Sequence, residues 1–467
     1  MLCKAVRPLV RAAAPRVQTR TYAVLSEDHS AVTYNRKGDQ VAAAPSIVKT
    51  VTQTASGIRI ATVDHLGPVS TVALVVKAGS RNESPDAPGV AHFFKNSLVR
   101  NVPGDTITRT VRETELRGDT LYAAHTREQL IVASDFLRDN LVDAVPLLFE
   151  NFFNTHHYPY EFLHTRPHVI EQASASLADP TVKVFDSLHQ AAFRHGLGNS
   201  LFATAPAAKA LKRAHLHEFA AKYFTADRIA VVGSGVAHKD LQPLVEEAIT
   251  RFQDRFGKSS VSVPVSKFRG GEIRIEAGPK AESHYAVAFP AVAFSDPLYP
   301  AALVLRAILD GSKRAKWGNA SGSAGALASA ATAKTSVTAF EAAYSDAGLI
   351  GFYVQGSNSD VKDSVGKAIA ALKETASKVS EEALSRGKKI AIVDAESALS
   401  RDVAIQEIAK QVLVKGDVAV PADLAAAIKK VTAADVQKVA KTATAAKPAV
   451  VAYGNLLKLP FADELSI

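Results

Sequence analysis

The stretch SRNESPDAPGVAHFFKNSL, residues 80–98, contains the pattern that decides the fold. Its first half is rich in turn-forming serine, proline, aspartate and glycine, and a helical pattern begins at Val90. Val90 and Phe94 are four residues apart and mark the buried face of this helix. His92 and Asn96 have the same spacing and share another face. Two side chains one helical turn apart can hold one metal ion, so the helix is a candidate for zinc chemistry.

The composition indicates a globular protein with more than one core. The chain has 467 residues, of which 47% are hydrophobic and 22% charged. This balance argues against disorder and is typical of a chain with two or three cores. The sequence contains no run of about 18 apolar residues, the length that spans a bilayer, so we expect any membrane association to be peripheral.

The first 22 residues have the composition of a mitochondrial transit peptide. They contain five lysine or arginine residues, and the first acidic residue is Glu27. We predict cleavage near Tyr22, which lowers the net charge from +9 to +4 because five positive charges leave with the segment. Cys3, the single cysteine, leaves as well. The mature chain is therefore expected to have no disulfide, no thiolate metal site and no cysteine nucleophile.

Three local patterns recur at a nearly constant distance along the chain. The tripeptide IRI at Ile58–Ile60 returns at Ile273–Ile275, an offset of 215 residues. A strand followed by an amphipathic helix begins at Leu130 and again at Leu349, an offset of 219. A closing strand, RIAVVG, recurs as AVVAYG at an offset of 221. Their order and register predict a tandem duplication.

Strand-like and helical patterns are mixed within each copy. The run VSTVALVVKAG is typical of a strand, whereas DNLVDAVPLLFENFF has the spacing of a helix with one buried face. Strict alternation of strands and helices is absent, which favours an α+β fold of two tandem homologous α/β-sandwich domains. We place the domains at residues 45–253 and 270–460, with a polar, serine-rich linker at 254–269.

The sequence around the helix, AGSRNE followed by GVAHFFKN, resembles the pitrilysin and mitochondrial processing peptidase family. The zinc helix of that family reads His-x-x-Glu-His, in which both histidines bind zinc, the glutamate activates water, and a later glutamate completes the site. By this resemblance His92 matches the first ligand, Lys95 replaces the base and Asn96 replaces the second ligand. Gln172, 76 residues after Asn96, replaces the third ligand. The resemblance implies the pitrilysin-like fold in both domains.

These replacements remove the chemistry that the helix would need. Catalytic zinc requires three ligands drawn from histidine, cysteine and carboxylate, together with an open position for water. The ammonium group of Lys95 cannot accept a proton from water, and it repels a divalent cation. We therefore predict no catalytic residue, no metal and no cofactor, and we expect His92 to be a hydrogen-bonded structural histidine. The residues disfavour the alternative of an active zinc metallopeptidase.

Two other segments invite a functional hypothesis. His156, His157, His164 and His168 gather in one stretch but lack a carboxylate or cysteine in matching register, so we do not expect a metal there. The glycine-rich segment 318–330 lacks the Gly-Lys-Ser/Thr ending of a phosphate-binding loop. It is either a flexible loop or, by the resemblance, a degenerate counterpart of the substrate-recognition loop of the processing peptidases.

Three stretches narrow the resemblance to members of the family that are not peptidases. They are HFFKN, VFDSLHQAAFRHGLGNSLF and AFEAAYSDAGLIGFYV, the last with a Tyr-Ser-Asp turn between two strands. They resemble core subunits of a respiratory complex of the mitochondrial inner membrane. This implies a scaffold on the matrix side, paired with a homologous core subunit beneath the haem and iron–sulfur subunits. The alternative is a non-catalytic, substrate-recognising subunit of the processing peptidase.

Overall fold

The computed structural model describes five parts of the chain: residues 47–154, 156–257, 261–312, 325–397 and 401–465. The side chains of 401–404 are not described. The predicted transit peptide and most of the glycine-rich segment 318–330 lie outside these ranges. Ile47–Ile467 forms one compact unit. Within the described ranges, no helix combines the length and the apolar composition that a membrane span requires.

The first half of this unit combines one sheet with helices. Its strands are β1 (Val48–Gln53), β2 (Arg59–Asp64), β3 (Val69–Val76), β4 (Thr120–His125), β5 (Leu130–Leu137) and β6 (Ile229–Ser234). Its helices are α1 (Val90–Ser97), α2 (Ile107–Arg117), α3 (Leu141–Phe153), α4 (Pro159–Ala178), α5 (Pro180–Phe193), α6 (Ala205–Ala210), α7 (Arg213–Tyr223) and α8 (His238–Phe252).

The second half repeats this mixture. Its strands are β7 (Gly271–Glu276), β8 (Ser283–Ala291), β9 (Thr335–Ala343), β10 (Gly348–Gly356) and β11 (Ala449–Gly454). Its helices are α9 (Tyr299–Leu309), α10 (Val361–Ser377), α11 (Glu381–Ser397), α12 (Arg401–Lys415), α13 (Pro421–Lys430) and α14 (Ala433–Thr444).

The two sheets share one topology. The strand order is β1-β2-β6-β3-β5-β4 in the first sheet and β7-β11-β8-β10-β9 in the second. Each sheet has one parallel pair, β2 with β6 and β7 with β11, and the other neighbours are antiparallel. Strands β7 to β11 therefore repeat β2 to β6, and β1 is an addition to the first sheet. The prediction of two tandem homologous α+β domains is confirmed, whereas the domain boundaries stay a prediction.

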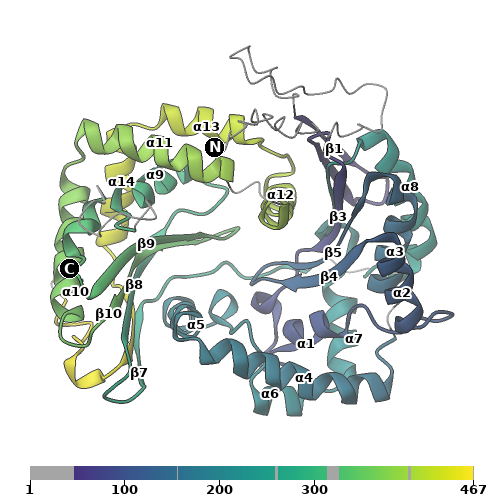
Figure 1. Ribbon diagram of the computed structural model, residues 1–467, viewed down its shortest axis with the longest axis horizontal. Coiled ribbons are helices and arrows are strands. Elements are labelled where there is room, and N and C mark those ends of the chain that lie inside the picture. Colours follow the sequence, from purple (N-terminus) through teal and green to yellow (C-terminus); the bar gives the residue numbers. More distant parts are fainter. Residues whose placement is uncertain (1–46, 155, 258–260, 313–324, 398–400, 466–467) are drawn as a thin grey trace, which may run out of the picture. The chain divides into compact units, whose positions relative to one another are not determined.

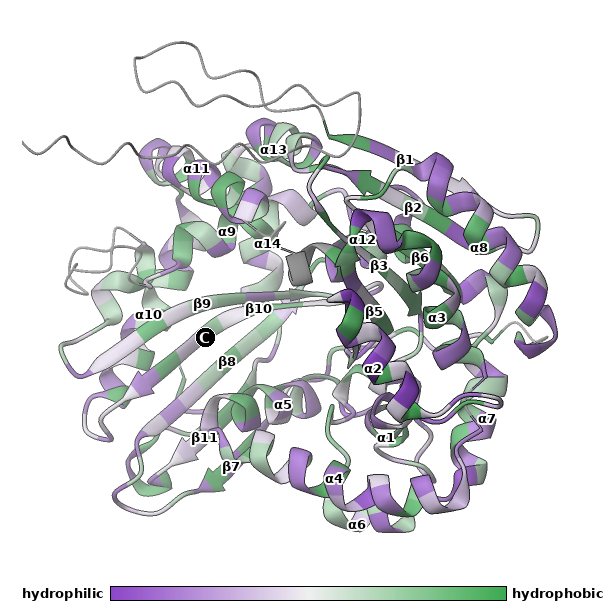
Figure 2. Ribbon diagram, turned by 45° about the vertical axis from the view of Figure 1, so that its right-hand side comes forward, coloured by the Kyte–Doolittle hydropathy of each residue, from purple (hydrophilic) through white to green (hydrophobic). Residues whose placement is uncertain are grey.

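The central strands are buried on both faces. In β3, Val72 and Leu74 belong to the hydrophobic core under one face, whereas Ala73 and Val75 belong to a separate core on the other. Successive strand residues point to opposite faces, so an uninterrupted apolar run fills two cores at once. Figure 2 shows this run as the green, hydrophobic colour of β3. The smaller alanine side chains lie on the face that a single helix covers.

Each sheet is covered by helices of its own half on one face and by a helix of the other half on the opposite face. Helices α3 and α8 cover the first sheet, and α9, α10 and α14 cover the second. On the opposite faces, α12 from the second half packs on β2, β3 and β6, and α5 from the first half packs on β7, β8 and β11 (Figure 1). This reciprocal exchange explains why the two halves form one compact unit.

The apolar face of α12 contains the residues that hold this helix on the sheet of the other half. Ile405, Ile408 and Val412 recur at three- and four-residue spacing, and all three are buried in the core above the first sheet. Burying each of these side chains stabilises the arrangement by about 1.5–3 kcal/mol. The guanidinium group of Arg59 at the start of β2 adds a hydrogen bond, 2.8 Å, to the carbonyl oxygen of Val412.

Candidate functional site

The helix that carries the degenerate motif begins at a position that only glycine suits. Gly89 has φ +79°, and a Cβ atom there would lie 2.4 Å from the Cβ of Ala203. The two carboxyl oxygens of Glu83 accept hydrogen bonds from the amides of Gly89, 2.7 Å, and Ala91, 2.9 Å. These contacts fix the first turn of α1 against the segment that contains Ala203. The helix can therefore present its next residue, His92, to a defined set of neighbours.

The structure brings the four motif positions together around one atom. Oε1 of Gln172, on α4, lies 2.9 Å from Nε2 of His92, 3.2 Å from Nζ of Lys95 and 2.9 Å from Nδ2 of Asn96. The neighbouring Glu171 is exposed and points elsewhere. Three hydrogen-bond donors thus converge on one amide oxygen. A metal ion in this place would instead need three ligand atoms with free lone pairs.

The tautomer of His92 is the reverse of what a zinc ligand needs. The backbone amide of Ala203 donates to Nδ1 of His92 at 3.1 Å, so Nδ1 carries no proton and Nε2–H donates to Gln172. A histidine that binds zinc through Nε2 has that nitrogen free and donates Nδ1–H to an acceptor. The residues present therefore do not fit a zinc ion, and no hydrolytic step can be derived from them.

The electrostatics of the cluster favour neutral groups. His92 is 1% exposed, and burial lowers its pKa to about 4 against the opposing effect of the hydrogen bond that it donates to Gln172. Its ring stacks on His125 with centroids 5.2 Å apart, and burial lowers the pKa of His125 to about 4 as well. Burial also lowers the pKa of Lys95. Among the described residues, no group of three or more histidine, cysteine, aspartate or glutamate side chains could hold a metal ion.

Two contributors to the cluster had no signal in the sequence. His125 lies on β4, where its Nε2 donates to the carbonyl oxygen of Leu201 at 2.8 Å. Ala203 acts through its backbone amide, which residue type does not reveal. The arrangement can hold α1, α4 and β4 together by hydrogen bonds and ring stacking, but it offers neither a general base nor a ligand set.

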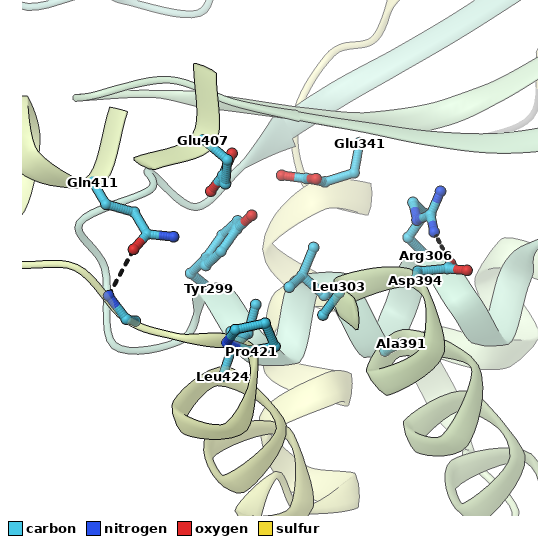
Figure 3. A pocket seen from close by; sticks show the side chains of 12 residues that line it. Tyr299, Leu303, Arg306, Glu341, Ala391, Asp394, Glu407, Gln411, Pro421 and Leu424 are labelled. Carbon is cyan, nitrogen blue, oxygen red and sulfur yellow. Dashed lines mark hydrogen bonds and ion pairs between the residues drawn. The ribbon is translucent and has the colours of Figure 1, made fainter. Parts of the chain in front are cut away.

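A separate hollow of about 220 Å³ lies among α9, α11, α12 and α13. The carboxylates of Glu341 and Glu407 point toward the same space beside Tyr299 (Figure 3). Burial raises the pKa of Glu341 to about 7, although Lys410 and Arg306 act in the opposite direction. The hollow therefore holds a carboxyl group that is partly protonated at neutral pH.

The folded chain is expected to lose stability when the pH falls from about 6.5 to about 5. Burial lowers the pKa of four histidines to about 3 or 4: His92, His125, His157 and His189. The unfolded chain protonates these histidines near pH 6.5, whereas the folded chain keeps them neutral. Glu83 and Glu341 act oppositely, because burial raises their pKa to about 8 and about 7. Near pH 6.5 the two effects nearly cancel, whereas at about pH 5.5 and below the unfolded chain binds about two protons more, which corresponds to roughly 2.7 kcal/mol lost per pH unit.

Thermal unfolding between pH 7.5 and pH 5, at constant ionic strength, measures this slope. The matched variant is His125→Gln, in which the amide nitrogen can keep the hydrogen bond to Leu201 without titrating. Its melting temperature should depend less steeply on pH than that of the parent chain. An identical slope in both proteins would contradict the assignment of His125.

Two family models match the chain, one in each half. Residues 59–205 match the model described as Insulinase (Peptidase family M16), and residues 210–391 match the model described as Peptidase M16 inactive domain. The order of the two matches follows the order of the two homologous halves. The chain belongs to the insulinase family, peptidase family M16, and the predicted family resemblance is confirmed.

The individual relatives carry a more specific name. The chain is 31% identical to the mitochondrial cytochrome b-c1 complex subunit 2 of Yarrowia lipolytica, over 89% of this chain and 96% of the relative. It is 29% identical to the human protein of the same name, over 89% and 91%. The mitochondrial-processing peptidase subunit beta of Dictyostelium discoideum is 26% identical, over 88% and 89%.

A solved structure shares the fold. A chain of the structure titled Complex III2 from Candida albicans, Inz-5 bound, matches with a TM-score of 0.76 over 89% of this chain and 98% of that chain. The two sequences are 20% identical, so this likeness supports the fold. A match over 89% of this chain necessarily includes residues of both halves.

Proposed function

We propose that the chain is a non-catalytic core subunit of the mitochondrial ubiquinol–cytochrome c reductase, complex III. The observation that carries the proposal is the similarity to cytochrome b-c1 complex subunit 2 over nine-tenths of the chain. The donors around Gln172 support the absence of peptidase chemistry, because they exclude the ligand set and base that hydrolysis needs. A scaffold needs only folded surfaces, so the loss of these groups is compatible with its role.

The partners within the complex are the finer part of this proposal. The chain would pair with core protein 1 and support the cytochrome b, cytochrome c1 and Rieske subunits. It would be peripheral to the inner membrane, on the matrix side. The haem and iron–sulfur centres would belong to those partners, and this chain would supply no cofactor and no metal ligand. Its N-terminal 22 residues would direct it to the mitochondrion.

A non-catalytic subunit of the processing peptidase is the second candidate. The 26% identity to the beta subunit of that peptidase supports it, since the match covers most of both chains. The higher identity to subunit 2 of the cytochrome b-c1 complex favours the first candidate. An active zinc metallopeptidase is disfavoured by Lys95, Asn96 and Gln172.

Purification of the tagged chain from mitochondrial inner membranes in a mild detergent tests the proposal. The expected result is co-elution with the absorbance of b-type and c-type haem, together with quinol–cytochrome c reductase activity. The matched control is the same membrane preparation without the tag. A haem-free heterodimer that cleaves presequences would refute the first candidate and support the second.

A further inference from the structure

A cavity of about 410 Å³ lies where the two halves meet. Its lining comes from loop and 3-10 residues of both halves, from Val414 of α12 and from the segment between the halves. The charged and amide side chains of this lining are Lys77, Arg81, Asn82, Glu128, Arg228 and Asp346. Three of these side chains are cations and two are carboxylates, so the pairing of charges decides what the cavity can bind.

Both carboxylates of the cavity are already engaged. Arg81 donates to Glu128 at 2.6 Å and to Asp346 at 2.5 Å. Glu128 also accepts from the amide of Ser345 at 2.9 Å, and Asp346 accepts from the amide of Ser266 at 2.7 Å. The turn between β9 and β10 is thereby fixed to the first half of the chain. Arg81 is the cation that balances these groups most directly.

Lys77 and Arg228 are left without such a partner among the described side chains. Arg228 is 7% exposed, its Nε has no hydrogen-bond partner, and its Nη2 donates to the carbonyl oxygen of Lys77. Burial lowers the pKa of Arg228 against an opposing effect of Asp227, and its guanidinium lies over the ring of Tyr223, 5.3 Å from the centroid. Burial together with the nearby arginines lowers the pKa of Lys77, against an opposing effect of Glu128. Arg228 is buried and Lys77 is half-buried. A cation held away from water without an ion pair is costly unless an anion joins it.

Two further features point to an anion. The side-chain amide of Asn82 uses its oxygen to accept from Gly79 at 3.2 Å, which leaves its NH₂ group as a donor on the cavity wall. A neighbouring hollow of about 470 Å³ shares Val265 with the cavity. Its described lining includes Arg194 and Lys267 and contains no carboxylate. Positive charge in adjoining clefts raises the local concentration of anions.

We propose that this cavity binds a small oxyanion, which accepts hydrogen bonds from Lys77, Arg228 and Asn82. Phosphate and a small carboxylate share the required chemistry, since both present several anionic oxygens to ammonium and guanidinium donors. The anion compensates the two unpaired cations beside the junction of the halves. This site is separate from the cluster around Gln172, and it does not depend on the proposed function.

Calorimetric titration of inorganic phosphate into the purified full-length chain, at constant ionic strength, tests the site. Saturable 1:1 binding is expected, with a rise in melting temperature as phosphate increases. Lys77→Gln should weaken phosphate binding by about tenfold to a hundredfold, because it removes a charged donor. Lys77→Arg should retain binding. Lys373→Gln, a loss of the same charge on the exposed face of α10, should leave binding unchanged.

The melting temperatures of the same variants show whether a loss of phosphate binding comes from misfolding. Without phosphate, Lys77→Gln should melt no lower than the parent, because it removes an uncompensated cation. Titration with malonate separates the two sources: binding of phosphate without malonate assigns a phosphate site, and binding of both assigns a general oxyanion site. The proposal would be overturned if neither phosphate nor malonate bound, or if the parent and Lys77→Gln bound phosphate equally.

Discussion

Ala409→Asp in α12 is expected to lower the free energy of unfolding by about 4 kcal/mol or more. Ala409 is 0% exposed and lies in the core between α12 and the first sheet. This core consists of apolar side chains from the sheet and the helix, so a new carboxylate loses its hydration there. The aspartate must either remain protonated or pull the helix away from the sheet. Both outcomes weaken the exchange that joins the two halves.

Denaturant unfolding of the parent and variant chains measures this loss. Gln406→Asp is the matched control, since it introduces the same side chain on the same helix at an exposed position. The control should differ from the parent by no more than about 0.5 kcal/mol. Limited proteolysis provides a second readout, because a displaced α12 should be cut first. If the two variants unfold alike, α12 does not cover the sheet as described.

Much of the fold could be predicted because its signals are local. Strand runs, helical spacing and the repeated IRI and closing-strand patterns each lie within about ten residues, and their constant offset predicts the duplication. The parallel pairs β2–β6 and β7–β11 then follow the same order in both halves. The exchange of helices could not be predicted in this way. The spacing of Ile405, Ile408 and Val412 predicts a buried face, but it does not specify which sheet buries it.

The candidate site likewise has a part that the sequence predicts and a part that only the folded chain shows. The positions of His92, Lys95, Asn96 and Gln172 follow from a spacing in the sequence, and the structure places the first three side chains within hydrogen-bond distance of Gln172. The amide of Ala203 that sets the tautomer of His92 comes from a residue 111 positions later. Backbone donors carry no signature in residue type, so only the folded chain reveals that the histidine faces a donor.

The combined variant Lys95→Glu, Asn96→His and Gln172→Glu is expected to change the cluster from no stoichiometric zinc to one zinc per chain. The changes replace the carboxamide of Asn96 by a second imidazole and that of Gln172 by a carboxylate, and they remove the ammonium of Lys95 that repels the ion. The present donors lie 2.9 Å from Oε1 of Gln172. Tetrahedral ligands with bonds of about 2.0–2.1 Å lie roughly 3.3 Å apart, so the side chains need to separate by only a few tenths of an ångström.

Metal analysis of the dialysed variant, with chelator competition for the affinity, measures the outcome. The control keeps Asn96 and carries only Lys95→Glu and Gln172→Glu, so it has one imidazole fewer and should lose zinc on dialysis. The affinity of the combined variant should still be about 10 to 100 times weaker than that of a site whose histidine donates Nδ1–H to an acceptor, because the amide of Ala203 faces Nδ1 of His92. A folded combined variant that binds no zinc would show that this backbone donor, or a different register, excludes the metal. Zinc bound at reduced affinity would instead show that α1 and α4 retain the geometry of a metal site. The present side chains and the amide of Ala203 would then be what prevents zinc binding.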